Sequence, residues 1–165
     1  MNRRLSYQPK EKFIERIKLL LNDDKDVEKF FEYCKSQPKK SIRVNTLKIT
    51  PNLLIDKLEK MDWKIEQPFS DYKEIIKINN GLNPGELGKT KEHLLGYYYV
   101  QEITSMMPII ALNSKADESI LDLCAAPGSK TTQMASFMEN KGNIIANDIS
   151  IGRIIILSSN LERCG

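Results

Sequence analysis

The feature that most constrains the fold is the segment LDLCAAPGSKTTQMA, residues 121–135. It begins as a short apolar strand, breaks at Ala-Ala-Pro-Gly and resumes as a helix that opens near Lys130. A strand, a glycine-containing turn and a helix are how α/β proteins hold an anionic ligand, because the first N–H groups of the helix are free. An apolar strand pattern, GNIIAND, and a helical pattern, SIGRIIILSSNLER, follow at once. This β-α-β-α order predicts the opening half of a doubly wound, Rossmann-like α/β domain.

The residues before this half-domain predict two further regions. Residues 8–34 carry apolar side chains at helical spacing, which indicates helices. Residues 41–49 alternate and are rich in β-branched side chains, a helix is expected from Pro51, and WKIEQ and EIIKI are typical of strands. We therefore expect three regions: an N-terminal helical segment at 1–38, a small α+β unit at 39–95 and a truncated Rossmann-like domain at 96–165.

Composition argues against several classes of protein. Hydrophobic residues make up 41% and charged residues 28% of the chain, as in globular proteins with an apolar core. No apolar run approaches the length of a membrane span, and the charged start lacks the core of a signal peptide, so we expect a cytoplasmic protein without a membrane segment. The three cysteines form no C-x-x-C pair and His93 is the only histidine, so no metal site is expected.

Positive charge is concentrated near the N-terminus. Residues 1–50 carry thirteen Lys and Arg against seven Asp and Glu, whereas the whole chain has a net charge of only +3. A basic segment beside a ligand site favours a polyanionic partner, most often nucleic acid, although a solvated lysine-rich face is the plainer interpretation. Three adjacent tyrosines at 97–99 could stack on bases but are more typical of packing at a domain junction. The candidate phosphate contacts are Lys35, Lys39, Lys40 and Arg43.

Three ligands compete for the turn. A P-loop is excluded because Cys124 and Ser129 occupy its glycine positions, and a dinucleotide fingerprint is excluded because Gly128 is the only glycine present. S-adenosylmethionine needs one turn at a helix N-terminus for its carboxylate, and an acid at the end of the next strand for its ribose. Asp148 stands at that place, twenty residues after Gly128. Spacing alone gives equal weight to two interpretations. One is this cofactor site, and the other is a plain β-α turn with Asp148 as the residue that initiates the next helix.

The segment LDLCAAPGSKT closely resembles the cofactor motif of the Nol/Nop/Sun family of RNA 5-methylcytosine methyltransferases. SIRVNTLK, GYYYVQEITSMMP and ANDISIGRIIILSSNLERCG resemble further segments of that family in the same order, so the resemblance covers roughly residues 8–165. It implies that the 39–95 unit is of an RNA-binding type and that S-adenosyl-L-methionine is the cofactor. The loop would wrap the methionine end of the cofactor. Asp148 would accept hydrogen bonds from the ribose hydroxyls, and Arg153 would support the loop. The residues implied for the cofactor are Cys124, Ala125, Ala126, Pro127, Gly128, Ser129, Lys130, Asp148 and Arg153.

The resemblance also implies chemistry that this sequence lacks. In the family a cysteine of a later Pro-Cys motif attacks C6 of cytosine, and no Pro-Cys dipeptide occurs among the 165 residues. We expect that motif beyond Gly165, no catalytic residue within the chain, and a fragment that is inactive alone. The leading hypothesis is therefore the N-terminal part of a tRNA or rRNA cytosine-C5 methyltransferase. The alternatives are a noncatalytic RNA-binding module with a degenerate methyltransferase half, and a small-molecule methyltransferase, against which SIRVNTLK and the basic segment argue.

Overall fold

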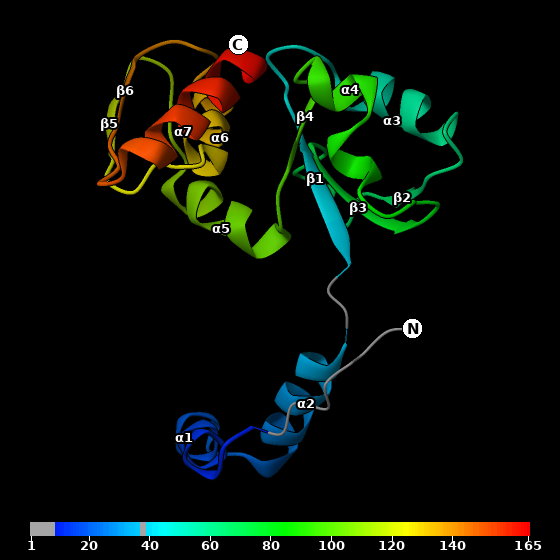
Figure 1. Cartoon of the computed structure of the whole chain (residues 1–165), viewed down its shortest axis with the longest axis vertical. Coiled ribbons are helices and arrows are strands. Elements are labelled where there is room, and N and C mark those ends of the chain that lie inside the picture. Colours follow the sequence, from blue (N-terminus) through cyan, green and yellow to red (C-terminus); the bar gives the residue numbers. More distant parts are fainter. Residues whose placement is uncertain (1–8, 37–38) are drawn as a thin grey trace. The chain divides into compact units, whose positions relative to one another are not determined.

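The computed structural model describes residues 9–36 and 39–165, which divide into two compact units with the boundary after Pro38. The first unit contains helices α1 (Glu11–Leu21) and α2 (Asp24–Lys35), which contact each other (Figure 1). Their contact is aromatic, with ring centroids 5.3 to 6.4 Å apart among Phe13, Phe30 and Phe31. The two helices expected from the periodicity of this region are therefore present.

The second unit, Lys39–Gly165, contains a four-stranded antiparallel sheet and a two-stranded parallel sheet (Figure 1). The antiparallel sheet has the order β2-β3-β1-β4. The strands of this sheet and the helices between them are, in chain order, β1 (Lys40–Val44), α3 (Pro51–Glu59), β2 (Lys64–Glu66), β3 (Ile75–Asn80), η1 (Glu86–Gly88), α4 (Lys91–Leu94) and β4 (Tyr98–Val100). The elements that follow are α5 (Ile103–Leu112), β5 (Ser119–Asp122), α6 (Ser129–Phe137), β6 (Asn143–Ala146) and α7 (Ile151–Cys164).

The core of the antiparallel sheet lies on one face of β1. Strand alternation sends Ile42 and Val44 to that face, where they pack with Leu54 and Leu58 of α3 and with Trp63. All five side chains are 2% exposed or less. Burying an apolar side chain of this size contributes about 1.5–3 kcal/mol, so this cluster anchors the second unit.

Among residues 9–36 and 39–165, elements cover only one face of the parallel sheet. β5 and β6 pair from Ser119↔Asn143 to Asp122↔Ala146, and every second residue points to the helices. On that side Ile120 and Ile144 pack against a cluster formed by α5 and α6. The parallel β-α-β-α arrangement predicted from the sequence is therefore present.

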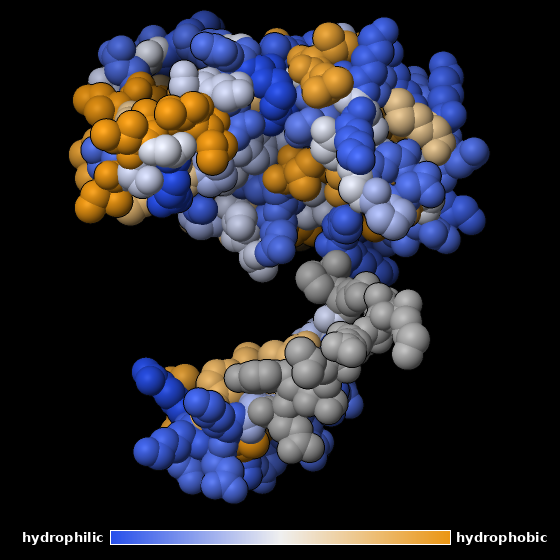
Figure 2. Space-filling view, viewed as in Figure 1, coloured by the Kyte–Doolittle hydropathy of each residue, from blue (hydrophilic) through white to orange (hydrophobic). Residues whose placement is uncertain are grey.

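The other face of the parallel sheet is apolar and exposed. Hydrophobic side chains gather over β5, β6 and α7 (Figure 2). Among them Leu121, Leu123 and Ile145 are between 56% and 65% exposed. Parallel sheets are normally buried on both faces, so this surface is unusual for a finished α/β domain. No helix of the described residues is long and apolar enough to cross a membrane.

Two boundaries differ from those expected. The first strand ends at Val44 and not at residue 49, because the next side chain, Asn45, turns inward and donates to the carbonyl oxygens of Gly96 and Cys164. Tyr98–Val100, expected in the third region, is an edge strand of the antiparallel sheet. The three-part division of the chain stays a prediction, and the second and third regions share one compact unit.

Candidate functional site

The turn between β5 and α6 is shaped by Gly128. This residue is the N-cap of α6 and has a φ of 105°, in the left-handed region that glycine adopts without strain. The Gly128 N–H donates to the carbonyl oxygen of Ala125 at 2.7 Å, and the Ala125 N–H donates to the carbonyl oxygen of Asn147 at 2.8 Å. These two bonds close the turn and fix it against the end of β6.

The turn leaves the first N–H groups of α6 free of partners within the helix. An α-helix provides no acceptor for its first N–H groups, and its dipole makes this end attractive to anions. In α6 these groups belong to Ser129, Lys130 and Thr131. The helix begins at Ser129, one residue before the Lys130 expected from the sequence. A single carboxylate fits such a place.

Asp148 lies two residues beyond β6 and directly beside the turn. Its carboxylate accepts from the Ala126 N–H at 3.3 Å and from the Ser150 N–H at 3.1 Å. It also forms an ion pair with Arg153 of α7 at 3.1 Å. The Asp148 side chain is only 1% exposed and that of Arg153 is 51% exposed. The acid therefore stands next to the turn, as the spacing predicts, with a half-exposed guanidinium on it.

Two side chains of α7 hold carbonyl groups of the turn. The guanidinium of Arg153 donates to the carbonyl oxygen of Ala126, and the side-chain amide of Asn160 donates to that of Pro127 at 2.9 Å. A carbonyl group with such a donor resists rotation of its peptide plane. Arg153 thus lies where the resemblance places a support for the loop.

The other residues implied for the cofactor lie in the same turn. Ala125 and Ala126 are buried against Leu157 of α7, whereas Pro127 is exposed. Cys124 is an exposed free thiol. The structure therefore brings the implied residues to one place, and cofactor binding by them stays a prediction.

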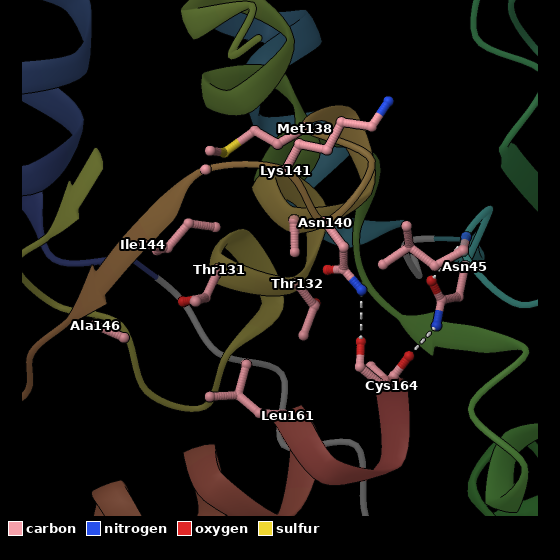
Figure 3. Close-up of a pocket in the computed structure, with 14 residues that line it drawn as sticks. Asn45, Thr131, Thr132, Met138, Asn140, Lys141, Ile144, Ala146, Leu161 and Cys164 are labelled. Atoms are coloured by element: carbon pink, nitrogen blue, oxygen red, sulfur yellow. Dashed lines mark hydrogen bonds between the residues drawn. The ribbon is translucent and has the colours of Figure 1, made fainter. Parts of the chain in front are cut away.

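A cavity of about 250 Å³ lies between α6, β6 and the end of α7 (Figure 3). Its lining includes Asn45, whose side-chain amide donates to the carbonyl oxygen of Cys164 at 2.7 Å. Neither Asp148 nor any residue from 124 to 130 lines it. The cavity is therefore distinct from the turn and contributes nothing to the site described above.

Three of the four candidate phosphate contacts lie on the surface. Lys35 is exposed at the end of α2 in the first unit. Lys39 and Lys40 are exposed at the beginning of the antiparallel sheet in the second unit. Their contact with RNA stays a prediction.

Arg43 is buried, and the prediction that it contacts phosphate is wrong. Its side chain is 1% exposed, and its guanidinium donates to Oε1 of Gln101 at 3.0 Å and to Oγ1 of Thr132 at 2.7 Å. Alternation along β1 does turn Arg43 away from the apolar core, but α6 covers that second face in place of water. Burial lowers the pKa of Arg43 to about 10, so the group stays cationic at neutral pH.

Three side chains of the site were missed by sequence reasoning. Ile149 follows Asp148 and is 99% exposed, which offers a bare apolar surface beside the acid; an apolar residue between the acid and the helix cap was a usable signal. Tyr99 and Asn160 both donate to the carbonyl oxygen of Pro127 across 28 and 33 residues of sequence. No local pattern encodes contacts at such separations.

Known proteins resemble the chain over nearly its whole length. The family model for the N-terminal domain of 16S rRNA methyltransferase RsmF matches residues 9–103, more than half of the chain, and that for 16S rRNA methyltransferase RsmB/F matches residues 109–165. Ribosomal RNA small subunit methyltransferase F of Vibrio campbellii is 40% identical over 158 residues, and that of Vibrio cholerae is 42% identical over 159. Each alignment covers 94% of this chain and 33% of the relative, so the chain spans about a third of the curated relatives' length.

Solved structures confirm the expected fold. A methyltransferase homolog protein from Pyrococcus horikoshii is 30% identical, with a TM-score of 0.74 over 95% of this chain and 54% of that one. NSun6 from Pyrococcus horikoshii with SFG is 22% identical, with a TM-score of 0.84 over 94% of this chain and 63% of that one, a likeness of fold alone. The resemblance seen in the sequence is confirmed as well. The chain belongs to the RsmB/F (Nol/Nop/Sun) family of methyltransferases, of which it carries the N-terminal domain and the first part of the catalytic domain.

Proposed function

We propose that this chain is the N-terminal part of an S-adenosylmethionine-dependent rRNA methyltransferase that acts on C5 of cytosine. One observation carries the cofactor assignment. The free N–H groups at the start of α6 and the buried carboxylate of Asp148 meet at the carboxyl ends of β5 and β6. Ligands of open α/β sheets bind at this edge.

The residues of the turn fit S-adenosylmethionine part by part. Its carboxylate suits the N–H groups of Ser129 and Lys130. Its ribose hydroxyls suit Asp148, because an ionised carboxylate accepts hydrogen bonds and donates none. Its adenine suits the bare side chain of Ile149. For the ribose to reach the acid, Arg153 has to release the carboxylate, and its half-exposed position leaves it room to turn toward solvent.

The cofactor supplies a methyl group when bound, and the residues of this chain hold and orient it. No residue of the chain is proposed to attack cytosine. Cys124 is exposed, but no side chain in the described part of the chain hydrogen-bonds to its thiol, so it lacks a base that would activate it. The proposal places the nucleophilic Pro-Cys motif in the part of the relatives' length that this chain does not span.

The bare face of the parallel sheet supports a domain that continues beyond these residues. Leu121, Leu123 and Ile145 are between 56% and 65% exposed on a face that parallel sheets of α/β domains normally bury. We infer that further elements of the same Rossmann-like domain cover this face. A gene that encodes no Pro-Cys motif after Gly165 would instead favour the noncatalytic RNA-binding module.

The cofactor assignment is tested with the variant Asp148→Asn. Losing an ionised acceptor for the ribose is expected to lower S-adenosylmethionine affinity by about tenfold or more. The exposed Asp56 of α3 provides the matched control, since Asp56→Asn makes the same charge change away from the turn. Equal affinities in the two variants would remove Asp148 from the site.

We propose rRNA as the substrate, bound in the cytoplasm, because the relatives are named for the small-subunit rRNA. Lys39 and Lys40 are proposed to neutralise phosphates, and each such contact contributes about 0.7 to the log–log salt slope on single strands. Changing both to Ala should therefore reduce the slope by about one to two units in anisotropy titrations. Lys57→Ala with Lys60→Ala on the α3 side removes the same charge as a control. If changing Lys39 and Lys40 leaves the salt slope unchanged, these lysines are only a solvated face. Equal slopes and affinities for rRNA and tRNA would mean that later parts of the enzyme select the RNA.

A further inference from the structure

The cofactor turn is held from two directions, and one of them lies outside the Rossmann-like half. Arg153 and Asn160 reach it from α7. On the other side it is reached from the antiparallel sheet, by Tyr99 of β4 directly and by Arg43 of β1 through Thr132. We propose that Arg43 and Tyr99 are positioning residues that set the cofactor turn. The inference rests on the proposed function for its ligand, but its geometry is independent of that function.

Tyr99 acts on the peptide that precedes Gly128. Its hydroxyl donates to the carbonyl oxygen of Pro127 at 3.1 Å. Tyr99 is 7% exposed, and the centre of its ring lies 5.9 Å from the guanidinium of Arg43 and 5.4 Å from that of Arg163. Contacts of this kind hold an aromatic ring in place. The hydroxyl is thus fixed against the same carbonyl group to which Asn160 donates.

Arg43 acts one peptide further along, through Thr132. Its guanidinium donates to Oγ1 of Thr132 at 2.7 Å, and the same oxygen lies 2.8 Å from the carbonyl oxygen of Gly128. Because arginine only donates, the hydroxyl accepts from Arg43 and its own hydrogen is free for the Gly128 carbonyl. The carbonyl of Ser129, a second possible acceptor, lies farther away at 3.3 Å. The direction of this chain of hydrogen bonds is therefore set from the antiparallel sheet.

Fixing these carbonyls aims the N–H groups of the turn. In a planar trans peptide the N–H points opposite to the preceding C=O. Holding the Gly128 carbonyl toward Thr132 therefore directs the Ser129 N–H, the first free donor of α6, the other way. Holding the Pro127 carbonyl toward Tyr99 directs the Gly128 N–H onto Ala125, which it meets at 2.7 Å. The Thr132 N–H of the helix also donates to the Gly128 carbonyl oxygen, at 2.9 Å, so the antiparallel sheet adds a second hold on the peptide that carries the first donor proposed for the methionine carboxylate.

The neighbouring residue Tyr98 provides a matched control. It is a buried tyrosine on the same strand, and its hydroxyl donates to the carbonyl oxygen of Leu87 at 2.7 Å, remote from the turn. Tyr98→Phe and Tyr99→Phe each remove one buried hydroxyl from β4 and leave the ring. A role in general stability predicts similar effects of the two variants, whereas positioning predicts a difference.

The first measurement needs no ligand. Hydrogen exchange of the 165-residue chain is compared at the backbone amides of residues 125–132, except for Pro127, in the wild type, Tyr99→Phe, Thr132→Val and Tyr98→Phe. Loss of one hydrogen bond corresponds to about two- to tenfold, so Tyr99→Phe and Thr132→Val should speed exchange of the turn by about that factor while Tyr98→Phe leaves it unchanged. Arg43→Lys, which keeps the charge but loses the planar fork, should act as Thr132→Val does, and Thr132→Val alone decides this arm if Arg43→Lys does not fold.

The second measurement compares S-adenosylmethionine with adenosine, which lacks the methionine end. Tyr99→Phe should weaken S-adenosylmethionine by about two- to tenfold and leave adenosine within about twofold, since Asp148 is untouched. Equal losses for both ligands, or a turn whose exchange is the same in Tyr99→Phe, Thr132→Val and the wild type, overturn the inference. A wild type that binds neither ligand at millimolar concentration, with faster exchange in the two variants, upholds the positioning of the turn and overturns the proposed cofactor site instead.

Discussion

Replacing Gly128 with alanine tests the turn through the backbone alone. At a φ of 105° an alanine pays the steric cost of a left-handed conformation, about 1–2 kcal/mol. The new Cβ would lie 3.0 Å from Cδ1 of Leu157, a side-chain end that gives way at small further cost. A loss of about 1–2 kcal/mol corresponds to a melting temperature lower by about 2–8 °C in a chain of this size. The fluorescence of Trp63, the only tryptophan and 2% exposed in the second unit, reports the transition.

Gly152→Ala provides a control for which the expected change in stability has the opposite sign. It lies in the first turn of α7 at ordinary φ, and a Cβ there would meet nothing nearer than the Ser150 hydroxyl at 4.0 Å. Gly152→Ala is expected to stabilise the chain by roughly 0.5–1 kcal/mol, because alanine loses less backbone entropy on folding. A Gly128→Ala variant that melts with or above the wild type would refute the turn geometry.

The remaining predictions concern side chains of the site. The exposed thiol of Cys124 should react with iodoacetamide in the native protein. The thiol of Cys164 should react only on unfolding, because it is buried and burial raises its pKa, so that less of it is thiolate. Equal labelling of the two cysteines in peptide mass spectra would contradict this packing. Ile149→Ala should leave stability within about 0.5 kcal/mol, because the side chain is 99% exposed. It should nevertheless weaken S-adenosylmethionine about fivefold or more, whereas Ile155→Ala on α7 should change neither. Calorimetry should show that the chain binds S-adenosylmethionine more weakly than low-micromolar, because the described parallel sheet has two strands; tighter binding would contradict this.

The strand-turn-helix unit could be predicted from the sequence because each of its signals is local. Gly128 marks the turn, apolar residues at strand and helix spacing mark its flanks, and Asp148 follows the second strand at the usual distance. The structure has β5, α6 and β6 at these places, with the acid beside the turn. These patterns predict the unit correctly because none of them depends on a contact with a distant part of the chain.

The position of Arg43 could not be predicted, because its surroundings are encoded elsewhere in the chain. Alternation within β1 shows which side chains share a face, but not whether water or a helix covers that face. Here the covering residue, Thr132, is 89 positions away. The pairing of Tyr98–Val100 with β1 is hidden for the same reason, since a three-residue strand has no periodicity of its own.

The central claim is that the turn and Asp148 form the S-adenosylmethionine site, and amide chemical shifts measured during a titration of the isotope-labelled 165-residue chain test it most directly. We expect the largest changes on residues 124–130 and on Asp148 to Ser150, with little change around the cavity lined by Asn45 and Asn140. Changes centred on that cavity, or none anywhere at millimolar ligand, would contradict it.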